Sequence, residues 1–110
     1  MFGNLGNLGN LMKQAQTMQE RAKKAQEEIA AYVAEGEAGG GLVRVTMTGE
    51  HKVTKVEIAD SVFGDDKDMC EDLLVTALNN AAERIREFSA EKMKKVTNGI
   101  PLPPGFNLPF

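Results

Sequence analysis

The residues of this chain that could do chemistry are basic, and they gather in two segments at opposite ends of the sequence. Residues 1–26 carry four basic residues against one acid, and residues 92–110 carry three lysines and no acid, a net charge of +3 in each segment. Between them lie six basic and fifteen acidic residues, a net charge of −9. Clustered cations on an otherwise acidic protein indicate a polyanionic partner. The candidate contact residues are Lys13, Arg21, Lys23, Lys24, Lys92, Lys94 and Lys95.

The remaining polar residues do not form a pattern typical of a catalytic or metal site. His51 stands alone beside an expected turn, and Cys70 falls on an apolar helix stripe where we expect a small buried side chain. The acids from Asp65 to Asp72 suit a helix start and lack the spacing of a calcium loop. The glycines at 36–41 precede a strand and lack the GK[ST] of a phosphate-binding loop. We therefore predict a protein that is not an enzyme, with no cofactor, no metal and no small-molecule substrate.

Length and composition predict one soluble domain over residues 1–110. The single cysteine fits a reducing intracellular compartment, and no apolar run approaches the ~20 residues of a membrane span. A chain of this size buries only about 60–70% of its unfolded surface, so that oligomerisation would stabilise it. We expect an intracellular protein without a membrane partner.

The first helix is predicted from about residue 10 to Ala31, a segment rich in Ala, Gln, Glu and Lys. It follows a leader at 1–9 that contains Gly-Asn-Leu repeats and is expected to be flexible, with Asn7 or Asn10 as the N-cap. Seven residues alternate at spacings of four and three, which is the seam of a helix that packs on another helix. Packing within the domain and packing on a second subunit are both compatible with it. The seam residues are Leu11, Ala15, Met18, Ala22, Ala25, Ile29 and Tyr32.

Strands are predicted after the glycine break at 36–41. Val43, Val45 and Met47 alternate with polar residues, a similar pattern follows at 53–58, and the turn around Gly49 joins the two into a hairpin. Residues 33–37 form a possible third strand.

A second long helix is predicted to begin at Asp65 or Asp66 and to end at Asn98-Gly99. Its apolar stripe is wider than a coiled-coil seam and suits a helix that covers a sheet. The uncharged segment 98–110 contains four prolines and predicts an extended, polyproline-like tail.

The lengths of these elements predict where the basic residues lie. Helices of about 22 and 30 residues measure about 33 and 45 Å, whereas seven-residue strands span about 23 Å. Both helices must therefore extend past the sheet, and their free ends are the two basic segments. The alternative is an ordinary solvated helix face, and the acidic pI of 5.2 weighs against strong nucleic-acid binding.

Several segments resemble the YbaB/EbfC family of bacterial nucleoid-associated proteins, and together they span essentially the whole chain. These segments are Met1-Phe2-Gly3, the run from Gly9 to Gln16 followed by Met18-Gln19-Glu20, Gly41-Leu42-Val43, Val56-Glu57-Ile58, Leu102-Pro103-Pro104-Gly105-Phe106 and the final Pro109-Phe110.

The resemblance implies an α+β fold: an α-β-β-β-α subunit with a three-stranded antiparallel sheet, two long projecting helices and a tweezers-like homodimer. It also implies a cytoplasmic, nucleoid-associated protein that binds double-stranded DNA with little sequence preference through its helical arms, affecting DNA compaction and gene expression. The alternative is a protein-interaction scaffold that uses the heptad seam and the Pro-rich tail, with DNA binding incidental.

Overall fold

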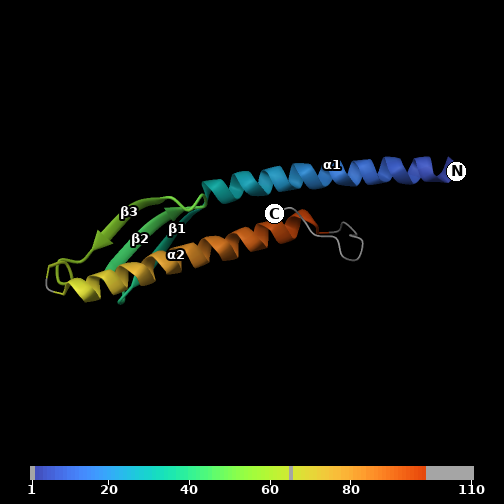
Figure 1. Ribbon diagram of the computed structural model, residues 1–110. Helices are drawn as coiled ribbons and strands as arrows, with labels where there is room; N and C mark the ends of the chain where they lie inside the picture. The colour runs from blue at the N-terminus through green and yellow to red at the C-terminus, as the bar shows by residue number, and fades with distance from the viewer. Residues whose placement is uncertain (1, 65, 99–110) are drawn as a thin grey trace.

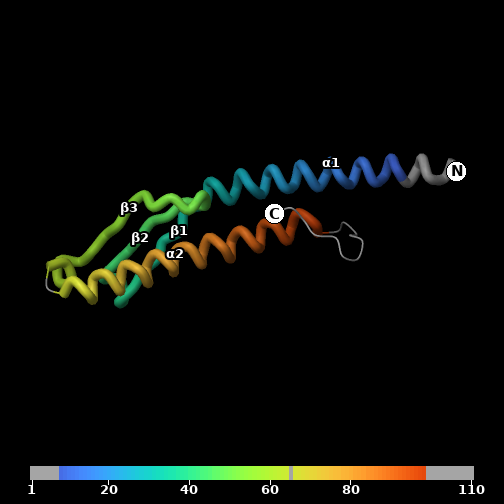
Figure 2. Tube along the Cα trace, viewed as in Figure 1, coloured from blue at the N-terminus to red at the C-terminus, as the bar shows by residue number. Residues whose placement is uncertain are grey.

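The computed structural model describes residues 2–64 and 66–98, which form two long helices and one sheet (Figures 1 and 2). The order is α1 (Phe2–Ala31), β1 (Val33–Ala38), β2 (Val43–Thr48), β3 (Val53–Ile58) and α2 (Lys67–Val96). The strands are antiparallel and lie side by side in the order β1-β2-β3. The predicted α-β-β-β-α subunit is therefore confirmed, including the strand at 33–37. The predicted tail lies, apart from Asn98, outside the described residues.

Helix α1 begins at Phe2 rather than near residue 10, so the expected leader and the expected N-cap at Asn7 or Asn10 are wrong. Glycine and asparagine weaken a helix by at most about 1 kcal/mol each. The segment from Leu11 onward supplies the nucleus, after which each further residue adds a hydrogen bond without a new nucleation cost. The helix that nucleates in the segment of strong helix formers therefore propagates back through the weak helix formers of the leader.

Helix α2 packs closely on β1 because both surfaces are lined with small residues. The inner face of β1 consists of Ala34, Gly36 and Ala38, all buried. A Cβ atom at Gly36 would collide with the carbonyl oxygen of Ala77 and lie 2.8 Å from the Cβ of Ala81. The backbones can approach this closely only because position 36 has no side chain.

The core lies between α2 and the first two strands. On β2, the predicted alternation is confirmed, since Val43, Val45 and Met47 are buried. They pack with alanines and Ile85 of α2 in two adjoining clusters. Cys70, expected to be buried, is a partly exposed free thiol.

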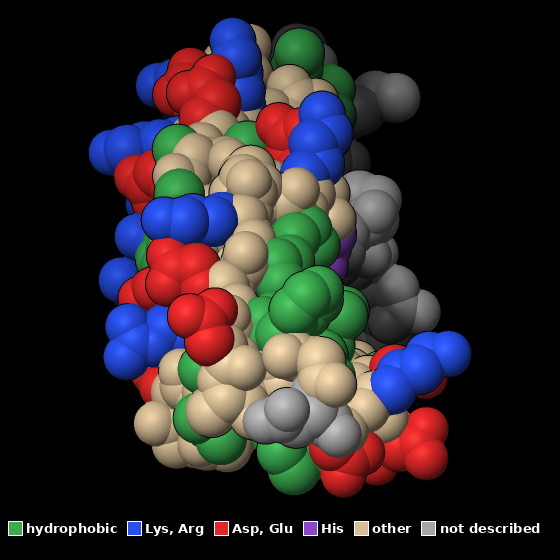
Figure 3. Space-filling view, turned by 90° about the vertical axis from the view of Figure 1, so that its left-hand side faces the viewer, with side chains coloured by type: hydrophobic (Ala, Val, Ile, Leu, Met, Phe, Trp, Pro, Cys, Tyr) green, Lys and Arg blue, Asp and Glu red, His purple; other side chains and the backbone are tan. Residues whose placement is uncertain are grey.

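Strand β3 is an edge strand with an exposed surface. Val56 lies opposite Val45 in the sheet, yet Val56 is 44% exposed whereas Val45 is fully buried. Helix α2 covers β1 and β2 but leaves this face of β3 open. The end-on view shows hydrophobic side chains at the surface beside a band of interleaved acidic and basic side chains (Figure 3).

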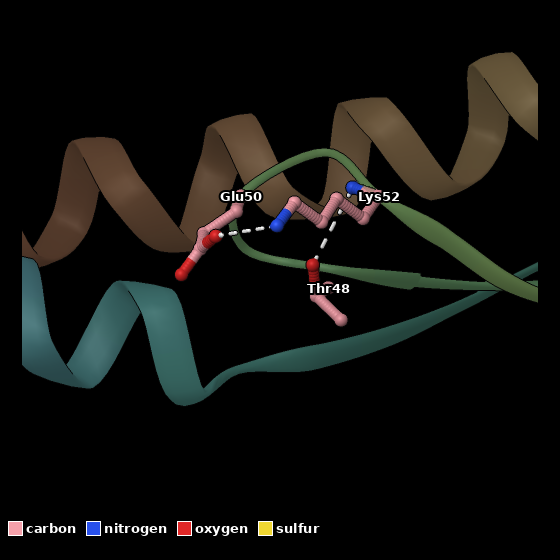
Figure 4. A network of polar contacts seen from close by, with 3 residues as sticks. All are labelled: Thr48, Glu50 and Lys52. Atoms are coloured by element: carbon pink, nitrogen blue, oxygen red, sulfur yellow. Dashed lines mark hydrogen bonds and ion pairs between the residues drawn. The ribbon is translucent and has the colours of Figure 1, made fainter.

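The hairpin tip attaches the sheet to the end of α1. The Gly49 N–H donates a 2.8 Å hydrogen bond to the Tyr32 carbonyl, and a Cβ atom at Gly49 would collide with the Ile29 carbonyl oxygen. Within the turn, the Lys52 N–H donates to Thr48 Oγ1 at 3.4 Å and the Lys52 ammonium lies 3.5 Å from Glu50 (Figure 4). The contacts of Gly49 hold the hairpin tip against the end of α1, and the contacts of Lys52 stabilise the turn itself.

The ends of α2 follow the expected capping rules. Asp66 is the N-cap, and its carboxylate accepts a 3.0 Å hydrogen bond from the Met69 N–H, as predicted. Lys94 and Lys95 lie in the last turn, where cations stabilise the helix dipole. Neither described helix is long and apolar enough to cross a membrane.

The molecule is elongated, measuring 76 × 24 × 17 Å along its principal axes. The sheet and the first half of α2 form one end, which we call the sheet end (Figure 1). The second half of α2 and the whole of α1 extend away from it, and we call this part the arm end. Helix α1 continues past the last turn of α2 (Figure 1). The predicted overhang of both helices is confirmed.

Candidate nucleic-acid interface

Three side-chain contacts between described residues join the C-terminal part of α1, with Tyr32 just after it, to the C-terminal part of α2, with Asn98 just beyond it. The rings of Tyr32 and Phe88 stack in parallel with their centroids 3.9 Å apart. Lys92 Nζ lies 3.0 Å from Glu28 Oε2 and 5.3 Å from the centroid of the Phe88 ring.

The third contact lies farther from the sheet, where Arg21 Nη1 donates a 2.7 Å hydrogen bond to the Asn98 carbonyl. Residue numbers fall along α1 as they rise along α2 through these contacts. The two helices of the arm end are therefore antiparallel and in direct contact.

A cleft of about 290 Å³ lies between the helices at this level, and we call it the notch. Ala25 and Val96 are buried and supply its apolar lining. Four cations and one carboxylate complete the wall, for a net charge of +3. The charged residues of the notch are Arg21, Lys24 and Glu28 from α1, and Lys92 and Lys95 from α2.

The structure brings four of the seven candidate contact residues together in the notch: Arg21, Lys24, Lys92 and Lys95. Lys94 shares with Lys95 a neighbouring depression at the end of α2. Lys23 lines a separate depression on α1 with Gln16, Gln19 and Glu20. Lys13 is exposed and precedes by eight residues Arg21, which contacts Asn98 just beyond the end of α2.

The basic residues do not occupy the tip of α1, which corrects the expected position. Because the helix begins at Phe2, its first eleven residues precede Lys13, and they contain neither acid nor base. These residues measure about 16 Å at the usual rise per residue. The cations form a band farther back along the arm end, centred on the notch.

The predicted seam is divided between two environments. Its C-terminal part, Ala25 and Ile29, is buried, and Tyr32 contacts Phe88. At the start of the seam, Leu11 is 59% exposed and Ala15 is exposed too. Two neighbouring apolar residues outside the seam, Leu8 and Met12, are 54% and 60% exposed. Met18 and Ala22 are intermediate. Packing within the chain therefore accounts for the end of the seam and leaves its start uncovered among the described residues.

Glu28 is the functional candidate that the sequence reasoning missed. Its pKa is lowered chiefly by the hydrogen bond from Lys92; desolvation opposes this effect, and the charges of Lys92, Lys24 and Lys95 lower the pKa further. Its spacing of four from Lys24 and seven from Arg21 places the three residues on one face of α1. That spacing was visible in the sequence, but the lysines of α2 were not assigned to the same cleft.

The lysines of the hairpin have a different environment. Lys52 lies 3.5 Å from Glu50, and Lys55 lies 2.7 Å from Glu57. The pKa of Lys55 is raised and that of Glu57 lowered, in both cases chiefly by their mutual hydrogen bond. Each hairpin lysine is thus neutralised by its own carboxylate. In the notch, four cations share one carboxylate, that of Glu28.

Comparison with known proteins agrees with this architecture. The model of the YbaB/EbfC DNA-binding family matches residues 4–100. The fold is similar to that in a crystal structure of an uncharacterized protein from Helicobacter pylori, with a TM-score of 0.63 and 23% sequence identity over 90% of this chain and 98% of that one. The second likeness concerns the fold alone, whereas the family match covers nearly the whole chain. The chain belongs to the YbaB/EbfC DNA-binding family.

Proposed function

We propose that this protein is a nucleoid-associated protein that binds duplex DNA with little sequence preference through the arm end of a homodimer. In this role it acts on the nucleoid in the cytoplasm, where it alters DNA conformation and compaction and thereby gene expression. Its function is binding rather than catalysis.

The notch is the observation that carries the proposal. Four cations from two helices converge on one cleft with a net charge of +3, although the chain as a whole has a net charge of −3. Local clustering attracts a polyanion even on an acidic protein, because screening limits the repulsion from acids more than about 10 Å away. The acidic pI is therefore compatible with binding at the arm end.

Phosphate groups are the expected contacts. Lysine and arginine side chains suit the sugar-phosphate backbone, and such contacts carry no direct sequence information. Lys13, Lys23 and Lys94 extend the positive surface beyond the notch, so a duplex could meet several cations at once.

The homodimer is supported by apolar surface that one subunit leaves exposed. Val53, Val56, Phe63 and Val75 are all more than 40% exposed at the sheet end, and Leu8, Leu11 and Met12 are exposed at the arm end. Exposed apolar surface of this extent is typical of an interaction site. We expect sedimentation to give twice the 11.9 kDa mass of the chain, and a well-folded monomer at micromolar concentration would contradict the dimer.

The test of DNA binding is an anisotropy titration of two unrelated duplexes of equal length between 50 and 200 mM salt. Both affinities should fall together as salt rises, because counterions released from DNA supply the driving force. No binding by the wild-type dimer at 50 mM salt would refute the proposal. A thousandfold preference for one duplex at equal salt would refute the lack of sequence preference.

The scaffold alternative rests on the uncovered start of the seam. Leu8, Leu11 and Met12 could bind a partner helix rather than a second copy of this chain. The same titration separates the two functions, because the DNA-binding function predicts measurable affinity at 50 mM salt, whereas an incidental DNA contact would be undetectable already at that concentration.

A further inference from the structure

Glu28 occupies the place in the notch that an anionic ligand would take. Its carboxylate lies 3.0 Å from Lys92 Nζ, and Lys24 and Lys95 line the same cleft. A carboxylate held among several cations has the charge and the acceptor oxygens of a phosphate group. Among the residues that the structure describes, it is also the only acid that lines the notch.

The other cations of the notch have capacity for a second anion. Among the described residues, Arg21, Lys24 and Lys95 form no ion pair with a carboxylate within 4.0 Å. Arg21 uses one N–H for the Asn98 carbonyl, and a guanidinium has five. The hydrogen bond to Asn98 also holds Arg21 across the gap between the helices.

The notch is large enough for a phosphate group. Its volume of about 290 Å³ is the space of about ten water molecules in the liquid. Cations from both helices line it, so one anion could contact α1 and α2 together.

We propose that the notch binds one backbone phosphate of duplex DNA, and that Glu28 is the resident counter-ion that this phosphate replaces at Lys92. The inference rests on the proposed DNA-binding function. Glu28 then has two effects: it joins the two helices in the free protein, and it lowers the affinity for DNA. DNA binding exchanges a carboxylate for a phosphate at Lys92 rather than engaging a free lysine.

The test is the substitution Glu28→Gln, with Glu27→Gln as its matched control. Both variants remove one negative charge from adjacent positions of α1, but Glu27 is exposed and does not line the notch. We expect Glu28→Gln to raise the affinity for a 30-base-pair duplex by about threefold to tenfold at 100 mM salt and to steepen its salt dependence. Glu27→Gln should raise the affinity by less than about twofold, because its exposed charge is screened by solvent and salt and does not line the notch.

A double-mutant cycle with Lys92→Gln tests the exchange itself. Without Lys92 the carboxylate has no partner to release, so Glu28→Gln in that background should have the same small effect as Glu27→Gln. Circular dichroism and sedimentation verify that each variant keeps its fold and mass. If Glu28→Gln fails to fold, Glu28→Ala, which keeps a strong helix former at the position, takes its place with Glu27→Ala as control, and the same threefold to tenfold gain is expected.

One result would overturn the inference while the DNA-binding function stands: wild-type protein binds DNA, and Glu28→Gln changes the affinity no more than Glu27→Gln, or weakens it. If wild-type protein binds no duplex at all, the proposed function fails first.

Discussion

The sheet end and the arm end of this molecule differ in how their charged side chains are paired. On the outer face of the sheet, charges alternate in sign, with Arg44 opposite Glu37 on one side and Glu57 on the other. The hairpin lysines Lys52 and Lys55 each lie within 3.5 Å of a carboxylate. In the notch, four cations surround Glu28. The sheet end is thus locally neutralised, whereas the arm end keeps a net positive charge.

The two ends also differ in how they are packed. Buried small residues hold α2 against β1, with Gly36 in contact with the backbone of α2. At the arm end, the helices touch through a few contacts, and the start of α1 has exposed apolar side chains. Stability is therefore concentrated at the sheet end, and the capacity to bind anions at the arm end.

The largest effect is expected when two cations of the notch are neutralised. Lys24→Gln with Lys95→Gln removes two exposed lysines, one from each helix. Affinity for duplex DNA should fall by about tenfold to hundredfold, and the salt slope by about 2, because two phosphate contacts are lost. Anisotropy titrations at several salt concentrations measure both quantities.

The matched control is Lys52→Gln with Lys55→Gln at the hairpin. It removes the same net charge, but both lysines are already paired with carboxylates. We expect less than about a twofold change in affinity. A larger loss from the hairpin pair than from the notch pair would place the DNA contact on the sheet end.

The packing difference predicts opposite outcomes for two Gly→Ala substitutions. Gly36→Ala should destabilise the fold by about 1–3 kcal/mol or more, since the new methyl group collides with backbone that no rotamer change can move. Gly9→Ala should increase the helical content, because nothing lies within 4 Å of that position and alanine favours a helix by about 0.5–1 kcal/mol. Denaturant unfolding and circular dichroism measure the two effects, and a tolerated Gly36→Ala would contradict the close contact between β1 and α2.

A smaller effect is expected in the titration of Glu28. Its pKa should lie below the ordinary value of 4.5, and Lys92→Gln should raise it, because the hydrogen bond from Lys92 is the largest cause of its lowering. The ion pair therefore stabilises the fold fully above about pH 4.5, and this contribution is lost as the pH falls through the lowered pKa. Side-chain carboxyl NMR measures the pKa, and an ordinary value in the wild type would show that the pair with Lys92 does not form in solution.

Local patterns in the sequence predicted most of the fold. The alternation in β2 and the wide apolar stripe of α2 depend on burial within one element, and Asp66 caps the next helix by a contact three residues away. The start of α1 was missed because propensity treats each Gly and Asn separately, whereas helix propagation depends on the strong segment that follows.

The candidate site was predicted by residue type but not by arrangement. Charge segregation along the chain identified Arg21, Lys24, Lys92 and Lys95 without showing that they line one cleft. The notch requires residues about 70 positions apart in sequence to meet, and the register of α1 against α2 depends on the Tyr32–Phe88 stack and the Arg21–Asn98 hydrogen bond. Helical periodicity within either helix contains no information about that register.

The most direct test of the account is a map of the duplex contact on the full-length protein. Backbone amide NMR spectra recorded during titration with a short duplex report every described segment at once. We expect the largest shifts at residues 13–28 of α1 and at residues 91–98, the end of α2 and the two residues after it, with little change at 50–57 in the hairpin. Shifts concentrated at 50–57, with the notch unchanged, would contradict the assignment of DNA binding to the arm end.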